Sequence, residues 1–217
     1  MTARTAPIAD VARTPRHADA PVRMETAELG MWIFIATEIL FFGGLFFAYL
    51  YGRSHFPEGF ALASRRTDVL LGTINTAVLL TSSFAVATAV AAAEHDRRRW
   101  VARLLWLTAA LGVVFLVIKG TEYRHEWSEH LFPGPGFALA ATPGAELFFV
   151  LYFLTTGLHA VHLTIGIVVM AAFAAGTEHK SGWAHPPRLQ VAALYWHFVD
   201  VVWIFLYPLL YLVERHS

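Results

Sequence analysis

The sequence predicts an all-α integral membrane protein, a bundle of five transmembrane helices. Composition is the first observation: 57% of the 217 residues are hydrophobic and 15% are charged, which is too few charges for a soluble domain. Length is the second, because about 20 apolar residues cross a hydrocarbon core about 30 Å thick and five apolar runs are long enough. The expected spans cover residues 29–51, 67–93, 100–119, 146–175 and 189–213.

Composition also excludes several classes of site. The chain has no cysteine, so disulfides, iron–sulfur clusters and thiolate metal sites are ruled out. Its formal net charge is zero, and the basic runs are short and lie beside the expected spans. We therefore expect no nucleic-acid partner.

The first 28 residues differ from the rest of the chain. They are rich in Ala, Thr, Pro and Arg and lack the apolar core and cleavage site of a signal peptide. We expect residues 1–28 to form a polar, mostly disordered cytoplasmic tail and residues 29–217 to form the membrane domain. Ten of the 16 Lys and Arg residues lie on the N-terminal side of the expected spans, including the run at 97–99. The positive-inside rule then places the N-terminus in the cytoplasm and the C-terminus outside.

The first expected span carries an acid, Glu38, within MWIFIATEILFFGG. It lies about nine residues from the cytoplasmic end, roughly 13 Å deep at about 1.5 Å per residue. Further along, Gly44 and Ala48 are four residues apart and form a patch of small residues that favours close approach of another helix. After this span, residues 52–66 are expected to be an ordinary external connection.

The polar residues of the second and third spans are expected to support packing between helices and not a catalytic or metal site. Residues 75–83 combine an amide with several hydroxyls, which favours hydrogen bonds between helices. The third span is expected to end at Lys119, whose side chain would extend toward the lipid head groups. Residues 124–130 contain His and Glu but lack the spacing of zinc proteases, so we expect a solvated loop there.

The last two spans hold the remaining polar residues. In the fourth span His159, His162 and Gly166 share one helical face, at positions i, i+3 and i+7. In the fifth span Asp200 lies near the middle of the bilayer, where a lone Asp costs about 2.5–3.5 kcal/mol. That face is therefore expected to point into protein, with His197 three residues away as a candidate partner.

Three interpretations of these histidines compete. One is haem ligation, which usually requires histidines on facing helices. Another is a metal site made of His159, His162, His197 and Asp200, because imidazole and carboxylate bind several divalent metals. The third, which we favour, is a buried hydrogen-bonded network of neutral histidines and carboxylates. We assign no catalytic, cofactor-binding or metal-binding residue, and we expect a buried polar network or lipid-associated site made of Glu38, His159, His162, Trp196, His197 and Asp200.

Five sequence motifs then point to a known family. They are MWIFIATEILFFGGLFFAY around Glu38, NTAVLLTSS at 75–83, IKGTEY at 118–123, TGLHAVHLTIG at 156–166 and YWHFVDVVWIFLY at 195–207. In this order they resemble subunit III of haem–copper oxidases of the cytochrome c oxidase type. The resemblance runs from about Gly30 to Tyr211, nearly the whole membrane portion.

The resemblance implies a non-redox accessory subunit of a bacterial terminal oxidase, part of a proton-translocating enzyme but without a catalytic centre of its own. It implies haem a and copper in partner subunits, direct contact with subunit I, association with subunit II and further subunits, possible membership of a respiratory supercomplex, and bound phospholipid. The implied roles are complex stability, lipid binding and sustained proton uptake, in the bacterial plasma membrane. By position, Glu38 matches the family's intramembrane acid, His159 and His162 its paired histidines, and His197 with Asp200 its last motif.

Other functions stay open from the sequence. Seven-helix members of the family have two more N-terminal helices, where this chain has a polar tail. A subunit III-like accessory protein of nitric oxide reductase, or subunit III of a quinol oxidase, is the alternative within the family. A self-contained membrane haem enzyme is the alternative outside it.

Overall fold

The computed structural model describes residues 19–178 and 186–212. Within these residues the chain is helical and has no strand, with five helices long and apolar enough to cross a membrane. The all-α, five-helix prediction is therefore confirmed. The long helices are α1 (Asp19–His55), α3 (Val69–Glu94), α4 (Arg98–Ser128), α5 (Ala145–Glu178) and α6 (Pro186–Tyr207); α2 (Pro57–Ser64) is short, and a π-helical segment, Pro208–Leu212, follows α6.

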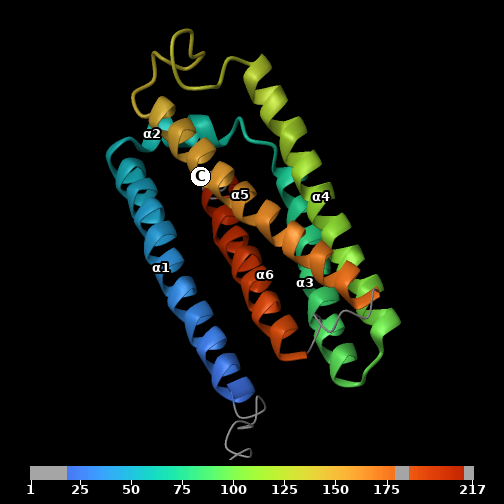
Figure 1. The fold of residues 1–217 in the computed structure, drawn as a ribbon. Helices are drawn as coiled ribbons and strands as arrows, with labels where there is room; N and C mark the ends of the chain where they lie inside the picture. Colours follow the sequence, from blue (N-terminus) through green and yellow to red (C-terminus); the bar gives the residue numbers. More distant parts are fainter. Residues whose placement is uncertain (1–18, 179–185, 213–217) are drawn as a thin grey trace, which may run out of the picture.

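Helix α6 is the centre of the bundle. It packs against α3, α5 and α1, whereas α1 contacts α5 and α6 and lies at one edge (Figure 1). Helices α3 and α4 form an antiparallel pair on the other side. The start of α1, the α3–α4 turn and the end of α5 lie at one end of the bundle, and α2 lies at the opposite end (Figure 1). Which end faces the cytoplasm stays a prediction.

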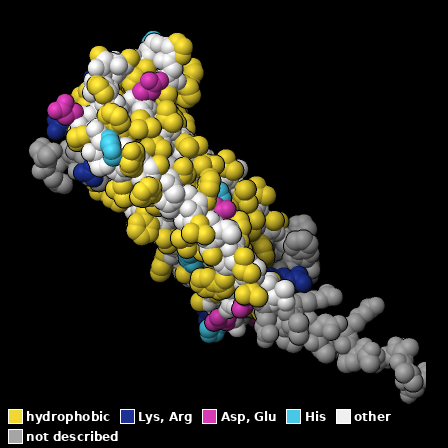
Figure 2. All heavy atoms as spheres, turned by 90° about the vertical axis from the view of Figure 1, so that its left-hand side faces the viewer, with side chains coloured by type: hydrophobic (Ala, Val, Ile, Leu, Met, Phe, Trp, Pro, Cys, Tyr) yellow, Lys and Arg dark blue, Asp and Glu magenta, His cyan; other side chains and the backbone are white. Residues whose placement is uncertain are grey.

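The outside of the bundle is suited to lipid. Figure 2 shows hydrophobic side chains over most of one face, with charged side chains gathered mainly toward its two ends. Large apolar side chains are exposed on all five long helices, for example Leu40, Phe84, Val117, Val168 and Phe205. Since apolar surface in water is unfavourable, this exterior agrees with a multi-pass membrane protein.

Local sequence explains where α3 begins and ends. The Asp68 side chain accepts hydrogen bonds from the backbone N–H groups of Leu70 and Leu71, at 2.9 and 3.1 Å, and so caps the helix. At the other end, the N–H of Asp96 bonds to the carbonyl of Ala93 and the N–H of Arg97 to that of Ala92, a Schellman motif. Asp96 has φ of 51°, a left-handed conformation that Asp adopts more readily than most residues.

Two glycines make room for Trp196, one of the two tryptophans that are fully buried among the described residues. A Cβ atom placed on Gly112 of α4 or Gly166 of α5 would lie 3.0 Å from the Trp196 ring. These glycines therefore allow α4 and α5 to approach α6 around the indole.

Several boundaries differ from expectation. Helix α1 starts at Asp19 and not at residue 29, while residues 1–18, the rest of the expected tail, lie outside the described residues. Residues 57–64 are not a plain connection but form α2, in which Phe60 and Ala63 are fully buried. Helix α4 runs on to Ser128, so residues 124–128 are helical and the loop predicted there is wrong. Helix α6 gives way to the π-helical segment at Pro208, which has no N–H to continue the α-helical pattern.

Candidate functional site

Glu38 of α1 and His162 of α5 lie opposite each other inside the membrane region. His162 Nε2 lies 3.3 Å from Glu38 Oε2, and their side chains are 16% and 18% exposed. His162 Nδ1 lies 2.9 Å from the carbonyl oxygen of Leu158, which can only accept, so Nδ1 carries a proton. Nε2 faces Glu38 Oε2, which has no hydrogen-bond partner among the described residues. The close approach of these two side chains links α1 to α5.

Helix α6 also contacts His162 and the neighbouring part of α1. The Tyr195 hydroxyl donates to the His162 carbonyl oxygen over 2.9 Å, and the Tyr195 ring lies 6.0 Å from that of Phe34 on α1. Phe42 packs edge-on against the His162 ring at 5.6 Å. The pair therefore lies where three helices meet.

His159 lies elsewhere, although it is only three residues from His162. It is 1% exposed, and its ring is 5.5 Å from Phe115 and 5.2 Å from Trp203. Neither ring nitrogen has a hydrogen-bond partner among the described residues. Over the same residues, no group of three His, Asp or Glu side chains is arranged to hold a metal ion. The absence of a metal remains a prediction.

The predicted residues of α6 contact hydroxyls of α3. Trp196 Nε1 donates to the Ser82 hydroxyl at 3.2 Å, and His197 Nδ1 lies 2.7 Å from the Ser83 hydroxyl. Asp200 is 3% exposed, and its carboxylate oxygens form no hydrogen bond with other described residues, although Ser83 is near enough to interact with it. Within the described residues, Glu38 approaches His162, while His197 and Asp200 both lie near Ser83; a single network of the six predicted residues stays a prediction.

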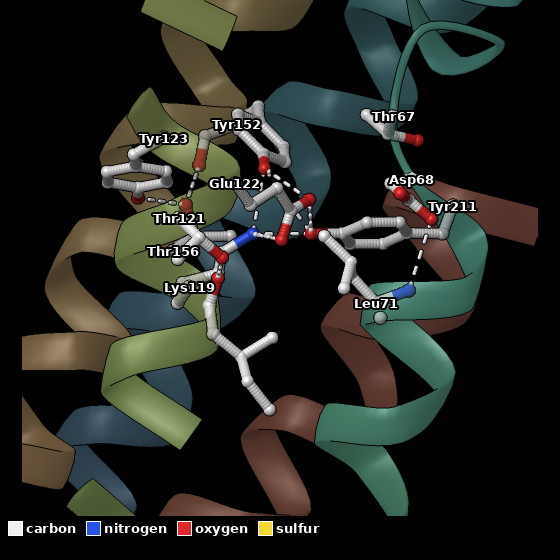
Figure 3. Close-up of polar contacts among 12 residues, drawn as sticks. Thr67, Asp68, Leu71, Lys119, Thr121, Glu122, Tyr123, Tyr152, Thr156 and Tyr211 are labelled. Carbon is white, nitrogen blue, oxygen red and sulfur yellow. Dashed lines mark hydrogen bonds and ion pairs between the residues drawn. The ribbon is translucent and has the colours of Figure 1, made fainter. Parts of the chain in front are cut away.

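A second polar cluster was missed by the sequence analysis. Lys119 and Glu122 of α4 meet Tyr152 of α5 and Tyr211 of the π-helical segment (Figure 3). The Lys119 ammonium lies 3.0 Å from Glu122 Oε2, donates to the Tyr152 hydroxyl over 2.7 Å, and also donates to the Tyr211 hydroxyl. Lys119 is 3% exposed, so the prediction that it reaches toward the head groups is wrong.

The bonding in this cluster is complete for the charged groups. An ammonium has three N–H donors, and Lys119 uses them on Glu122, Tyr152 and Tyr211. Both tyrosine hydroxyls in turn donate to Glu122 Oε1, at 2.9 and 2.6 Å. A buried charge is tolerated when it is paired and hydrogen-bonded, and here both charges are. The cluster fixes α4, α5 and the C-terminal segment to one another.

The missed cluster did have a sequence signal. Lys119, Glu122 and Glu126 occupy positions i, i+3 and i+7, which is one face of a helix. Glu126 is itself 2% exposed, and neither of its carboxylate oxygens has a hydrogen-bond partner among the described residues. These residues stand at the expected end of the third span, which favours interfacial charges, but their spacing on one helical face also fits a buried cluster.

A groove of about 500 Å³ opens on the surface between α1 and α6. Apart from His197 its lining is apolar. Residues from both helices form it, among them Trp32, Ile39, Gly43 and Phe46 of α1 and Val201 and Phe205 of α6. His197, which is bonded to Ser83 through Nδ1, therefore also lines an apolar groove.

The family model described as cytochrome c oxidase subunit III matches residues 10–214. The chain belongs to the cytochrome c oxidase subunit III family. It is 34% identical to cytochrome c oxidase subunit 3 of Thermostichus vulcanus over 86% of this chain and 87% of that protein. It is 29% identical to the probable quinol oxidase subunit 3 of Staphylococcus epidermidis over 87% of this chain and 90% of that protein. A match at 28% identity to the heme-copper oxidase subunit I+III of Aeropyrum pernix covers 89% of this chain and 23% of that protein.

Family membership confirms the resemblance drawn from the five motifs. This subunit III is an accessory subunit of a haem–copper oxidase, and its five apolar helices make it a multi-pass membrane protein. The motif residues do not gather at one site: Glu38 and His162 join α1 to α5, and Glu122 of IKGTEY joins α4 to the C-terminal segment.

Proposed function

We propose that this subunit III carries out no electron transfer itself and acts by packing against the catalytic subunit I of its oxidase, with haem a and copper held by partner subunits. In that role it stabilises the complex, retains phospholipid and sustains proton uptake during aerobic turnover. The observation that carries the proposal is the open face between α1 and α6, which includes the groove.

Polar residues at this face favour protein over lipid as its covering. His197 lines the groove and is bonded to Ser83. On the α3 side of α6, the Thr73 and Tyr207 hydroxyls bond at 2.6 Å, and Thr73 is exposed. Polar side chains within a bilayer usually face protein or water. Helix α1 also has the smallest buried share of the five long helices, so it has surface left for a neighbour.

Subunit I is the favoured neighbour because one relative is named as subunit I+III, which places both subunits in one chain. A pair that is fused in one organism is expected to be in contact where the two chains are separate. Phospholipid is expected to fill the part of the groove that subunit I leaves open, because exposed apolar surface of this kind accepts acyl chains.

Cytochrome c is our favoured electron donor, and the relative named as a quinol oxidase subunit keeps quinol as the alternative. The donor-binding site would belong to another subunit. Steady-state oxygen consumption with reduced cytochrome c, compared with a quinol, would decide between the two.

The main test is purification through a tag on this chain in mild detergent, followed by an optical spectrum and mass identification of the proteins that come with it. We expect a-type haem and subunit I. A nitric oxide reductase partner would reassign the chain to that enzyme. A haem spectrum from this chain alone would support the haem-enzyme alternative, and a colourless chain without partners would refute the oxidase proposal.

The proposed contact of subunit I with the open face between α1 and α6 can be tested by a matched pair of substitutions on α1. Gly43 lines the groove and Gly44 does not, and a Cβ atom on either glycine would meet no atom within 4 Å. Gly43→Leu should reduce the subunit I that co-purifies, whereas Gly44→Leu should reduce it less. The reverse order would show that subunit I docks on another face of α1.

A further inference from the structure

A separate pocket of about 470 Å³ lies where α3 turns into α4. It shares no residue with the α1–α6 groove. Its inner wall is mostly apolar, and its rim at the turn carries a histidine and an arginine. The lining consists of Thr88, Ala91, Ala92, His95, Arg97, Trp100 and Leu104.

The turn holds Arg97 in place without using its side chain. The backbone N–H of Arg97 closes the Schellman motif at the end of α3, and the residue is also the N-cap of α4. Its side chain makes no capping hydrogen bond and the residue is exposed. Asp96, its neighbour, is bonded to Arg98 at 3.0 Å, and no carboxylate among the described residues pairs with Arg97. The guanidinium is therefore positioned beside the pocket and available to an anion.

Aromatic and basic groups meet at this rim. Trp100 is 55% exposed, and the Arg103 guanidinium lies 5.8 Å from the centre of its ring. Tryptophan is enriched at the interface between head groups and acyl chains. The two acids of the turn, Glu94 and Asp96, do not line the pocket. The rim therefore favours the binding of a negatively charged group.

We propose that this pocket binds an anionic phospholipid. The phosphate would lie at Arg97 and His95, and the upper part of an acyl chain would lie along Ala91, Ala92 and Leu104. From Thr88 to His95 the α3 side of the pocket extends about 10 Å at about 1.5 Å per residue, which is deep enough for a glycerol backbone and the start of a chain. Basic pockets at the membrane surface are suited to anionic lipid head groups.

The apolar wall favours a lipid over free phosphate. A small anion would contact the rim and leave the alanine and leucine surfaces unfilled. A phospholipid satisfies both parts, because its charge meets the arginine and its chain removes the apolar wall from contact with water.

The test uses the full chain in mild detergent with whatever subunits remain bound. Dioleoylphosphatidylglycerol and dioleoylphosphatidylcholine are titrated separately, and bound lipid is measured by native mass spectrometry. We expect the anionic dioleoylphosphatidylglycerol to bind more tightly than the zwitterionic dioleoylphosphatidylcholine. Arg97→Gln should weaken binding of the anionic lipid about fivefold, the contribution of one basic residue near a charged lipid surface. Arg98→Gln is the matched control, because it removes the same charge from the same turn at a residue that does not line the pocket.

A second variant tests the apolar wall without changing charge. Ala91 is exposed in the pocket, and Ala91→Leu should reduce lipid binding by occupying the space of the chain. Millimolar inorganic phosphate should not displace the lipid. Equal effects of Arg97→Gln and Arg98→Gln, or equal affinity for both lipids, would overturn the proposal. Displacement by phosphate together with unchanged binding in Ala91→Leu would instead show a site for a free anion.

Discussion

At the scale of single residues, Lys119 and Glu122 are the most sensitive charges, because both are buried and each is the counter-ion of the other. Lys119→Met should destabilise the bundle by about 3–5 kcal/mol, since Glu122 would be left as an uncompensated buried charge. Unfolding in a detergent titration measures this loss. The double variant Lys119→Met with Glu122→Gln should recover much of it, and a double variant as unstable as the single one would contradict the pairing.

Glu38 and Asp200 are the acids that the sequence pointed to, and they should behave differently. Glu38→Ala removes the partner of His162 and loosens α1, so we expect a shorter active lifetime of the oxidase during turnover. Asp200→Ala removes a buried carboxylate that has no hydrogen bond within the described residues, so the bundle should lose little stability.

Progress curves of oxygen consumption, with lipid content measured alongside, test both acids. Glu38→Gln is the conservative control, because the amide keeps a hydrogen-bonding group opposite His162. Wild-type assembly, lipid content and sustained turnover in Glu38→Ala would refute a role for the pair.

At the scale of helices and turns, the contact of α2 with the start of α5 leaves no space for a side chain. A Cβ atom on Gly59 would lie 2.1 Å from the carbonyl oxygen of Pro143, which is backbone and cannot rotate away. Gly59→Ala should therefore lower the free energy of unfolding by about 1–3 kcal/mol. Gly120→Ala in α4 is the control, because a Cβ atom there meets nothing within 4 Å and alanine favours a helix. A thermal melt followed by tryptophan fluorescence compares them, and equal melting temperatures would contradict the steric argument.

At the scale of the whole molecule, the open question is which way the bundle faces. The chain has no cysteine, so single cysteines can be added without background. With the N-terminus in the cytoplasm, Glu129→Cys should react with an impermeant maleimide in intact spheroplasts, and Arg99→Cys only after permeabilisation. The opposite labelling pattern would invert the topology.

The extent to which sequence predicts this molecule depends on the kind of signal. The five spans were predictable because length and hydrophobicity are properties of each segment alone. The pairing of His197 with Ser83 was not, because it depends on how α6 is rotated against α3, and Asp200 on the same helix was the nearer candidate. The Lys119 cluster was missed since its tyrosines come from residues 33 and 92 positions further along the chain.

The pairing of Lys119 with Glu122 also bears on how the protein is made. Helix α4 leaves the ribosome before α5 and α6, so Tyr152 and Tyr211 do not lie beside it when it first reaches the membrane. Lys119 and Glu122 are three residues apart on that one helix and neutralise each other without help from the rest of the bundle. The nascent helix therefore enters lipid as a nearly neutral segment, and the later helices complete the hydrogen bonds of a charge pair that has already been inserted.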